Sequence, residues 1–133
     1  HRVKGGFFRA ASQHHELCVG SLEGMRTDTR GLLEAGTEVA KLGWEDAGDK
    51  EGWFDMRYYI LHQVSSVHTQ AVIDTLGIDG DRVVRSFPEY GNMGPAAIPV
   101  TLAGVQHTLE PGDGVMFQGM GSGINAAIVE IEW

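Results

Sequence analysis

From Arg57 onward the chain alternates between apolar segments and amphipathic segments, and this order constrains the fold more than any other feature. Segments rich in β-branched and aromatic residues, which favour strands, occupy 56–63, 82–87, 115–120 and 124–133. Helix-like segments at 65–76 and 94–105 separate the first three of them. This alternation is typical of a sheet covered by helices. It predicts an α/β layered architecture with a mixed sheet.

Local signals place further elements along the chain. A strand is expected around residues 7–8, after a break at Gly5 and Gly6. Apolar and small side chains recur every three or four residues over 25–42 and predict a helix that packs on the sheet. The polar, glycine-punctuated segment 47–53 reads as a loop.

Composition and charge narrow the possible classes of protein. A length of 133 residues suits a single domain, 1–133, with no internal linker beyond the loop at 47–53. Eighteen acidic against ten basic residues give a net charge of -8, and the basic residues are scattered, which argues against nucleic acid as a partner. The chain contains no apolar run long enough for a membrane span. Cys18, the single cysteine, has no partner for an internal disulfide, so a cytoplasmic location is expected.

Polar residues gather where predicted strands end. His62 and Gln63 follow the first of these strands, Gly91 and Asn92 follow the second, and the glycine-rich segment GMGSGIN (119–125) separates the last two. Open α/β sheets bind ligands at such an edge. A histidine, an asparagine and a turn with exposed N–H groups would stabilise a developing oxyanion. Removing one such donor typically costs about 10² to 10³ in rate.

The chain contains, in order, HQVSSVHTQAVIDTLGI, YGNMGPAAIPVTL and LEPGDGVMFQGMGSGINAAIVEIEW. In this combination they resemble the C-terminal half of the ketoacyl synthase III branch of the thiolase superfamily. The usual fatty-acid initiating synthases carry His-Gln-Ala-Asn and Gly-Asn-Thr-Ser, whereas this chain has HQVS and GNMGPA. Together with ASQHHELCVGSLEGMRTDT upstream, these details are more similar to the thiolases of bacterial olefin and β-lactone biosynthesis. Those enzymes join two fatty acyl-CoA molecules head to head into a β-keto acid.

The resemblance implies roles for three residues. His62 and Asn92 match the histidine and asparagine that donate hydrogen bonds to a thioester carbonyl oxygen as it acquires enolate character. Ser122 matches the position whose backbone N–H joins that of the nucleophilic cysteine in a second oxyanion hole. The resemblance implies acyl-CoA thioesters as substrates and neither a cofactor nor a metal.

The family's nucleophilic cysteine and the glutamate base of the olefin-type enzymes belong to the N-terminal half of the fold, which has no counterpart here. The resemblance therefore implies a partner, either a separate subunit or a cleaved part of the same precursor, and a dimer of such pairs. Two alternative functions stay open. In one, the complex of this chain with its partner is a decarboxylative synthase that uses malonyl-acyl carrier protein. In the other, this chain is a non-catalytic scaffolding half.

Several other residues are of types that can carry function. Cys18 lacks the helix N-terminus that activates a nucleophilic thiol, and with His14 and His15 it lacks a fourth metal ligand, so a small, buried or half-buried thiol is expected. His68 is expected to pack or to face solvent, and His107 carries no signal. Glu89 precedes a turn and reads as a surface acid that could tune the site at Asn92.

Aromatic and methionine side chains are the natural candidates for lining an acyl channel, although most of them are expected to form core. They are Phe7, Phe8, Met93, Met116, Phe117 and Met120.

Overall fold

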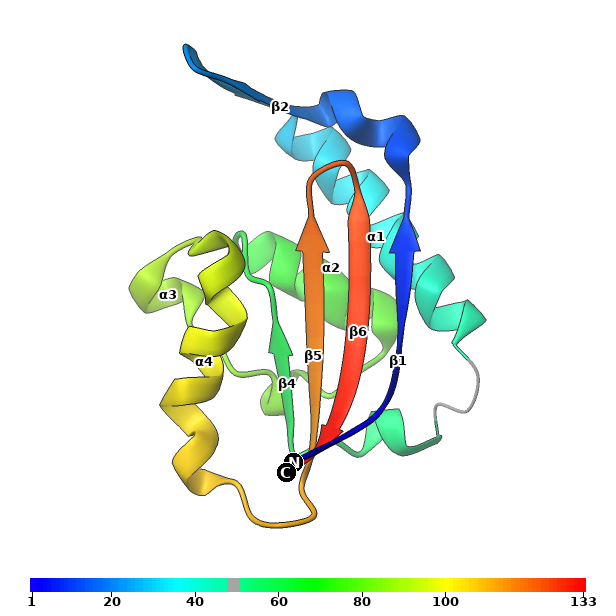
Figure 1. Cartoon of the computed structure of the whole chain (residues 1–133), viewed down its shortest axis with the longest axis vertical. Coiled ribbons are helices and arrows are strands. Elements are labelled where there is room, and N and C mark those ends of the chain that lie inside the picture. Colours follow the sequence, from blue (N-terminus) through cyan, green and yellow to red (C-terminus); the bar gives the residue numbers. More distant parts are fainter. Residues whose placement is uncertain (48–50) are drawn as a thin grey trace.

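The computed structural model describes residues 1–47 and 51–133, and its centre is a mixed four-stranded sheet (Figure 1). The strands are β1 (Arg2–Ala10), β4 (Tyr58–Leu61), β5 (Gly114–Gly121) and β6 (Asn125–Glu132). They lie in the order β1-β6-β5-β4, in which β4 runs parallel to β5 and the other neighbours are antiparallel. The predicted α/β architecture is confirmed.

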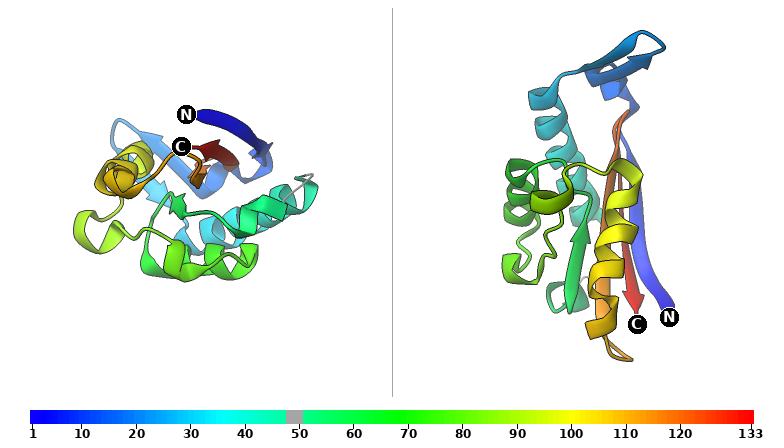
Figure 2. Two further views of the ribbon diagram at one scale, coloured as in Figure 1. Left: turned by 90° about the horizontal axis from the view of Figure 1, so that it is seen from below. Right: turned by 90° about the vertical axis from the view of Figure 1, so that its left-hand side faces the viewer.

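Helices cover both faces of the sheet (Figures 1 and 2). On one face, α1 (Thr29–Asp46) and α2 (Ser66–Leu76) pack in a core that includes Trp44, Leu61 and Met116. On the other face, α4 (Ala97–Val105) packs in a smaller core around Ile60 and Val115. The side chain of Ser65 caps α2 by accepting a hydrogen bond from the backbone N–H of His68 at 3.1 Å, so the predicted start of this helix is confirmed.

The strand predicted around residues 7–8 and the helix predicted over 25–42 are both present, but each starts at a different residue from the one predicted. Gly5 and Gly6 do not interrupt the chain before a strand but lie inside β1, where a side chain at Gly6 would overlap the backbone of Ile128. The predicted helix 25–42 begins only at Thr29, because Asp28 caps it by accepting a hydrogen bond from the N–H of Gly31 at 2.9 Å.

A β-hairpin of β2 (Cys18–Ser21) and β3 (Gly24–Thr27) occupies the place where the sequence predicted the helix to start. It projects beyond the end of the central sheet (Figure 2). Its apolar side chains Leu22 and Met25 are largely exposed. This hairpin was not predicted, because its strands have only four residues each and show no clear alternation.

The predicted strand 82–87 is wrong. Only Val83 forms a bridge, with Tyr59. The segment is held instead by the buried side chain of Gln63, whose Nε2 donates to the carbonyl of Val84 at 2.8 Å. Its Oε1 accepts from the N–H groups of Ser86 and Phe87, both at 3.1 Å. The backbone pairing with β4 is limited to this bridge, in which the N–H of Val84 donates to the carbonyl of Tyr59 at 3.1 Å, and side-chain hydrogen bonds hold the rest of the segment.

The predicted helix 94–105 is confirmed in position, although its first residues form a separate 3-10 turn before α4. A short helix α3 (Phe87–Tyr90), which the sequence did not predict, precedes it. Short 3-10 helices occupy Ser12–Leu17, Glu51–Phe54, Gly80–Arg82, Gly94–Ala96 and Gln106–Thr108. The predicted loop 47–53 is therefore partly 3-10 helical, and its residues 48–50 lie outside the described residues.

The two ends of the chain meet at one end of the sheet, where the rings of His1 and Trp133 stack with centroids 3.8 Å apart (Figure 1). In the described residues, no helix combines the length and the apolar character that crossing a membrane requires.

Candidate active site

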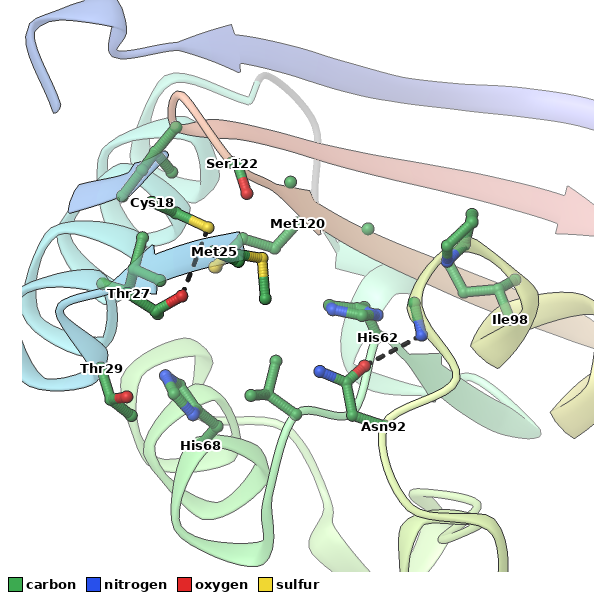
Figure 3. Close-up of a pocket in the computed structure, with 17 residues that line it drawn as sticks. Cys18, Met25, Thr27, Thr29, His62, His68, Asn92, Ile98, Met120 and Ser122 are labelled. Atoms are coloured by element: carbon green, nitrogen blue, oxygen red, sulfur yellow. Dashed lines mark hydrogen bonds between the residues drawn. The ribbon is translucent and has the colours of Figure 1, made fainter. Parts of the chain in front are cut away.

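A cleft of about 570 Å³ opens where β4 and β5 end (Figure 3). Five parts of the chain contribute its lining: the β2–β3 hairpin, the start of α1, the region from β4 into α2, the segment leading into α4, and the turn between β5 and β6. The predicted site residues His62, Asn92 and Ser122 all line this one cleft. Along the chain, His62 and Asn92 are 30 residues apart, and so are Asn92 and Ser122.

His62 is the first residue after β4, and its backbone N–H donates to the carbonyl of Gln118 on β5 at 2.7 Å. Its imidazole is half-buried, and this burial lowers the pKa of the ring because the charged form is poorly solvated. A hydrogen bond with the backbone of Gly94 opposes the effect, while the nearby His68 adds to it. The lowered pKa favours a neutral ring near pH 7.

Asn92 lies in a turn that fixes the direction of its side chain. Its Oδ1 accepts a hydrogen bond from the backbone N–H of Gly94 at 2.9 Å. Gly91 and Gly94 flank the turn with φ of 67° and 56°, a region that strongly favours glycine. Because the amide oxygen is engaged by Gly94, the Nδ2 group is left to face the cleft as a donor (Figure 3).

Gln63 holds this turn near His62. It directly follows His62, is 1% exposed, and its three hydrogen bonds fasten the segment 84–87 to the end of β4. From there the chain runs through α3 to Asn92. A second buried bond joins the hydroxyls of Ser86 and Thr101 at 2.6 Å and fixes α4 to the same segment.

Ser122 lies in the turn that joins β5 to β6. Its carbonyl accepts a hydrogen bond from Nδ2 of Asn125 at 3.2 Å, and Gly123 adopts a φ of 113°. The side chain of Ser122 lowers the pKa of the nearby Cys18 thiol. The predicted role of Ser122 in an oxyanion hole belongs to its backbone N–H.

Cys18 is half-buried, as expected, but its place in the cleft was missed. The hairpin turns its Sγ to 3.6 Å from Oγ1 of Thr27. Hydrogen bonds with Ser122 and then with Thr27 lower the pKa of the thiol. In the described part of the chain no three His, Cys, Asp or Glu residues come together as a possible metal site.

The sequence did not indicate that His68 lines the cleft. It lies on the first turn of α2, half-buried, and faces the cleft (Figure 3). Burial lowers the pKa of this imidazole as well. Glu89 is exposed and hydrogen-bonds with Tyr90, and neither Glu89 nor His107 belongs to the cleft lining.

Of the six side chains considered for an acyl channel, Met120 alone belongs to the cleft lining. Met116 is fully buried in the core beneath α1 and α2, whereas Phe8 is 70% exposed on β1. Met25 was missed, because it lies on the unpredicted hairpin. Periodicity identifies an apolar face but does not indicate which part of that face borders a cleft.

The cleft is neutral and largely apolar. Its lining, drawn entirely from described residues, contains no Asp, Glu, Lys or Arg, and Cys18, His62 and His68 are its titratable side chains. Val64, Ile98 and the two methionines supply much of the wall. Such a surface suits an uncharged ligand with a long apolar part and one polar group that approaches the donors of His62 and Asn92.

Curated proteins of similar sequence are known. The chain is 38% identical to the acyl-CoA:acyl-CoA alkyltransferase of Xanthomonas campestris pv. campestris and 36% identical to that of Shewanella oneidensis, over 99% and 100% of its length. It spans only 40% and 42% of those relatives.

Solved structures give the same result. The chain superimposes on OleA of Xanthomonas campestris with bound lauric acid and lauroyl-CoA at a TM-score of 0.90 and 38% identity, covering 99% of this chain and 40% of OleA. The crystal structure described as 3-oxoacyl-(acyl carrier protein) synthase III, FabH, from Xanthomonas oryzae matches with a TM-score of 0.90 and 39% identity, again over 99% of this chain and 40% of the other. The thiolase-like fold is confirmed.

Residues 51–133 match the family described as 3-oxoacyl-[acyl-carrier-protein (ACP)] synthase III C terminal. The chain therefore belongs to the C-terminal family of the ketoacyl synthase III condensing enzymes, and among its relatives are the OleA acyl-CoA:acyl-CoA alkyltransferases.

Proposed function

We propose that this chain forms one half of the active site of an acyltransferase that joins two fatty acyl-CoA thioesters head to head into a β-keto acid. The observation that supports the proposal best is the neutral cleft in which His62 lies beside Asn92 and whose lining also includes Ser122. The alkyltransferase relatives, and the OleA structure with bound lauroyl-CoA, favour acyl-CoA over other thioesters.

The proposed reaction has three steps. A cysteine thiol on the partner polypeptide first displaces CoA from one acyl-CoA to give an acyl-cysteine thioester. A base then removes an α-proton from the second acyl-CoA, and the resulting carbanion attacks the acyl carbon. The new carbon–carbon bond forms as the bond to the cysteine sulfur breaks, and the thiolate regains a proton. Water finally cleaves the β-ketoacyl-CoA into the β-keto acid and CoA.

His62 and Asn92 act in the second step. The thioester oxygen of the second acyl-CoA gains negative charge as its α-proton leaves, and donors from these two side chains lower the cost of that charge. The backbone N–H of Ser122 contributes to the second hole, in which the acyl-cysteine carbonyl becomes an oxyanion. The enzyme would act in the cytoplasm on acyl-CoA thioesters, and the reaction requires no bound cofactor.

The partner would supply the part of the fold that the relatives have and this chain does not, either as a separate subunit or as another part of one precursor. The nine-residue helix α4 supports this assignment. It carries no charged residue, yet Pro99, Val100, Ala103 and Gly104 are exposed on it. Helices that are apolar all round are normally buried. We place the partner against this face and expect pairs of the two polypeptides to dimerise.

The decisive experiment uses the chain assembled with that partner. The His62→Ala variant should form no detectable β-keto acid, while acylation of the partner's cysteine by acyl-CoA remains visible by intact mass. Unchanged product formation would exclude the proposed role of His62 and would favour a non-catalytic scaffolding half. The exposed Glu89→Gln variant is a control that should retain activity.

A decarboxylative synthase is the second candidate. It is favoured by relatives such as the β-ketoacyl-[acyl-carrier-protein] synthase III 3 of Streptomyces coelicolor, which is 32% identical over 67% of this chain. A panel of acyl-CoA and malonyl thioesters separates the two. Product from acyl-CoA alone supports head-to-head condensation, and product with CO₂ release only when malonyl thioester is present supports the alternative.

A further inference from the structure

Met120 and Gly36 form a contact that links the interior of the protein to the cleft. Met120 lies near the end of β5, where it packs against the core clusters beneath α1 and also lines the cleft. A Cβ atom added at Gly36 of α1 would lie 2.5 Å from Sδ and 3.3 Å from Cε of Met120. The thioether therefore occupies space that any other residue at position 36 would need.

We propose that the contact between Met120 and Gly36 sets the acyl chain length that the cleft accepts. The inference rests on the proposed function, because it assumes a fatty acyl substrate. The Met120 side chain limits the length of the acyl site. Because Gly36 has no side chain, the thioether of Met120 can pack against α1 and leave the cleft open.

Packing explains why a change at position 36 would reach the substrate. Around this contact Ala35, Val39 and Ile124 are all buried, so the core gives a displaced thioether little room. The open direction is the cleft. Methionine is unbranched and adapts its shape readily, so a methyl group at position 36 would turn the thioether outward at less cost than moving the helix.

Gly43 provides a matched control on the same helix. It lies seven residues after Gly36, so both glycines face the sheet. A Cβ at Gly43 would overlap the ring of Phe7, which packs near Trp53 with centroids 6.4 Å apart and is absent from the cleft lining among the described residues. Gly43→Ala therefore disturbs the same helix–sheet interface without reaching the cleft.

The test compares Gly36→Ala, Met120→Ala, the double variant and Gly43→Ala in the chain assembled with its partner. Each is measured for binding of saturated fatty acids from octanoic to octadecanoic acid and for condensation of the matching acyl-CoA thioesters. Met120→Ala should shift both profiles toward longer chains, and Gly36→Ala toward shorter ones. The longest substrate should lose roughly tenfold or more in kcat/KM per excluded methylene. The double variant should return toward the wild-type profile, and Gly43→Ala should lower the Tm without changing the profile.

The outcomes separate this inference from the proposed function. If the variants shift the chain-length profile of fatty-acid binding but the assembly forms no β-keto acid, the role of the contact is supported and the proposed reaction is refuted. If the wild type condenses acyl-CoA but no variant changes the chain-length profile, the inference about the contact is refuted and the proposed function stands. An equal shift of the profile in Gly43→Ala has the same meaning. If Gly36→Ala does not fold, Met120→Ala and Met120→Leu decide the matter, because unshifted profiles in both overturn the inference.

Discussion

The side-chain oxygen of Asn92 accepts a hydrogen bond from the backbone N–H of Gly94 at 2.9 Å, and His62 hydrogen-bonds with the backbone of the same glycine. The backbone of one residue thus contacts both side chains that are proposed as donors. Because the Gly94 N–H holds the oxygen of the Asn92 amide, the nitrogen is directed toward the ligand. This relationship makes the roles of the two residues separable by mutation.

Asn92→Asp should keep the turn and lose the reaction. A carboxylate oxygen can still accept from the Gly94 N–H, but the Nδ2 donor is gone and a negative charge stands beside the developing oxyanion. We expect condensation to fall by at least about 10² to 10³, with the Tm near that of the wild type. Acyl transfer and condensation rates, measured beside thermal unfolding, check this. A fully active variant would contradict donation by Asn92.

Gly94→Ala should displace both donors through the backbone. Gly94 has a φ of 56°, and a residue with a Cβ pays roughly 1 to 2 kcal/mol there. We expect a lowered Tm together with reduced condensation, because the turn that orients Asn92 and His62 shifts. Gly77→Ala is the control: Gly77 has a φ of 66° at the end of α2 and lies outside the cleft lining, so it should lower the Tm by a similar amount with little effect on rate.

Gln63→Leu should destabilise the protein and misplace Asn92. The substitution removes three hydrogen bonds from a buried site and leaves the carbonyl of Val84 and the N–H groups of Ser86 and Phe87 without that partner. Each unsatisfied buried group costs about 1 to 3 kcal/mol. Denaturant unfolding measures the loss, and we expect kcat to fall further than in Gln70→Leu, an exposed α2 variant. Wild-type stability would show that Gln63 does not hold the segment.

Stability should decrease as the pH falls below the ordinary pKa of histidine. Burial lowers the pKa of His62 and His68 from 6.5 in the folded protein, so below 6.5 the unfolded state binds more protons than the folded state. The stabilising effect of the neutral rings is complete above pH 6.5 and is lost as the pH falls through their folded pKa values. Denaturant titrations from pH 8 to pH 5 give the free energy of unfolding at each pH. This free energy should decrease less steeply with falling pH in His68→Gln than in the wild type. An unchanged slope would contradict the burial of this ring.

The reactivity of Cys18 should depend on Ser122. The hydrogen bond with Ser122 is the main cause of the lowered pKa of this thiol, and Thr27 contributes less. Ser122→Ala should therefore raise the pH at which iodoacetamide alkylates Cys18, and Thr27→Val should raise it less. Peptide mass spectrometry resolves Cys18 from other cysteines in the assembly. If both variants react like the wild type, the thiol does not face Ser122 in solution.

The sequence by itself determined the layered fold, for local reasons, and it supplied the three residues predicted to form the site. Alternating segments specify strands and helices wherever the pattern is long, as in β5, β6 and α2. The ordered residues His62, Asn92 and Ser122 carried the resemblance to a family that the comparisons confirmed. Their gathering in one cleft follows from strand ends that meet at one edge of the sheet.

Only the tertiary structure decided which other residues join them. Segment 82–87 has the composition of a strand, yet it forms a single bridge with β4, and the amide of Gln63 binds its backbone. The β2–β3 hairpin brings Cys18 and Met25 to a cleft that His62, Asn92 and Ser122, far away in the sequence, also line. The reason is physical: local propensity depends on neighbours along the chain, whereas a cleft and a buried hydrogen bond depend on contacts that exist only after the sheet has formed.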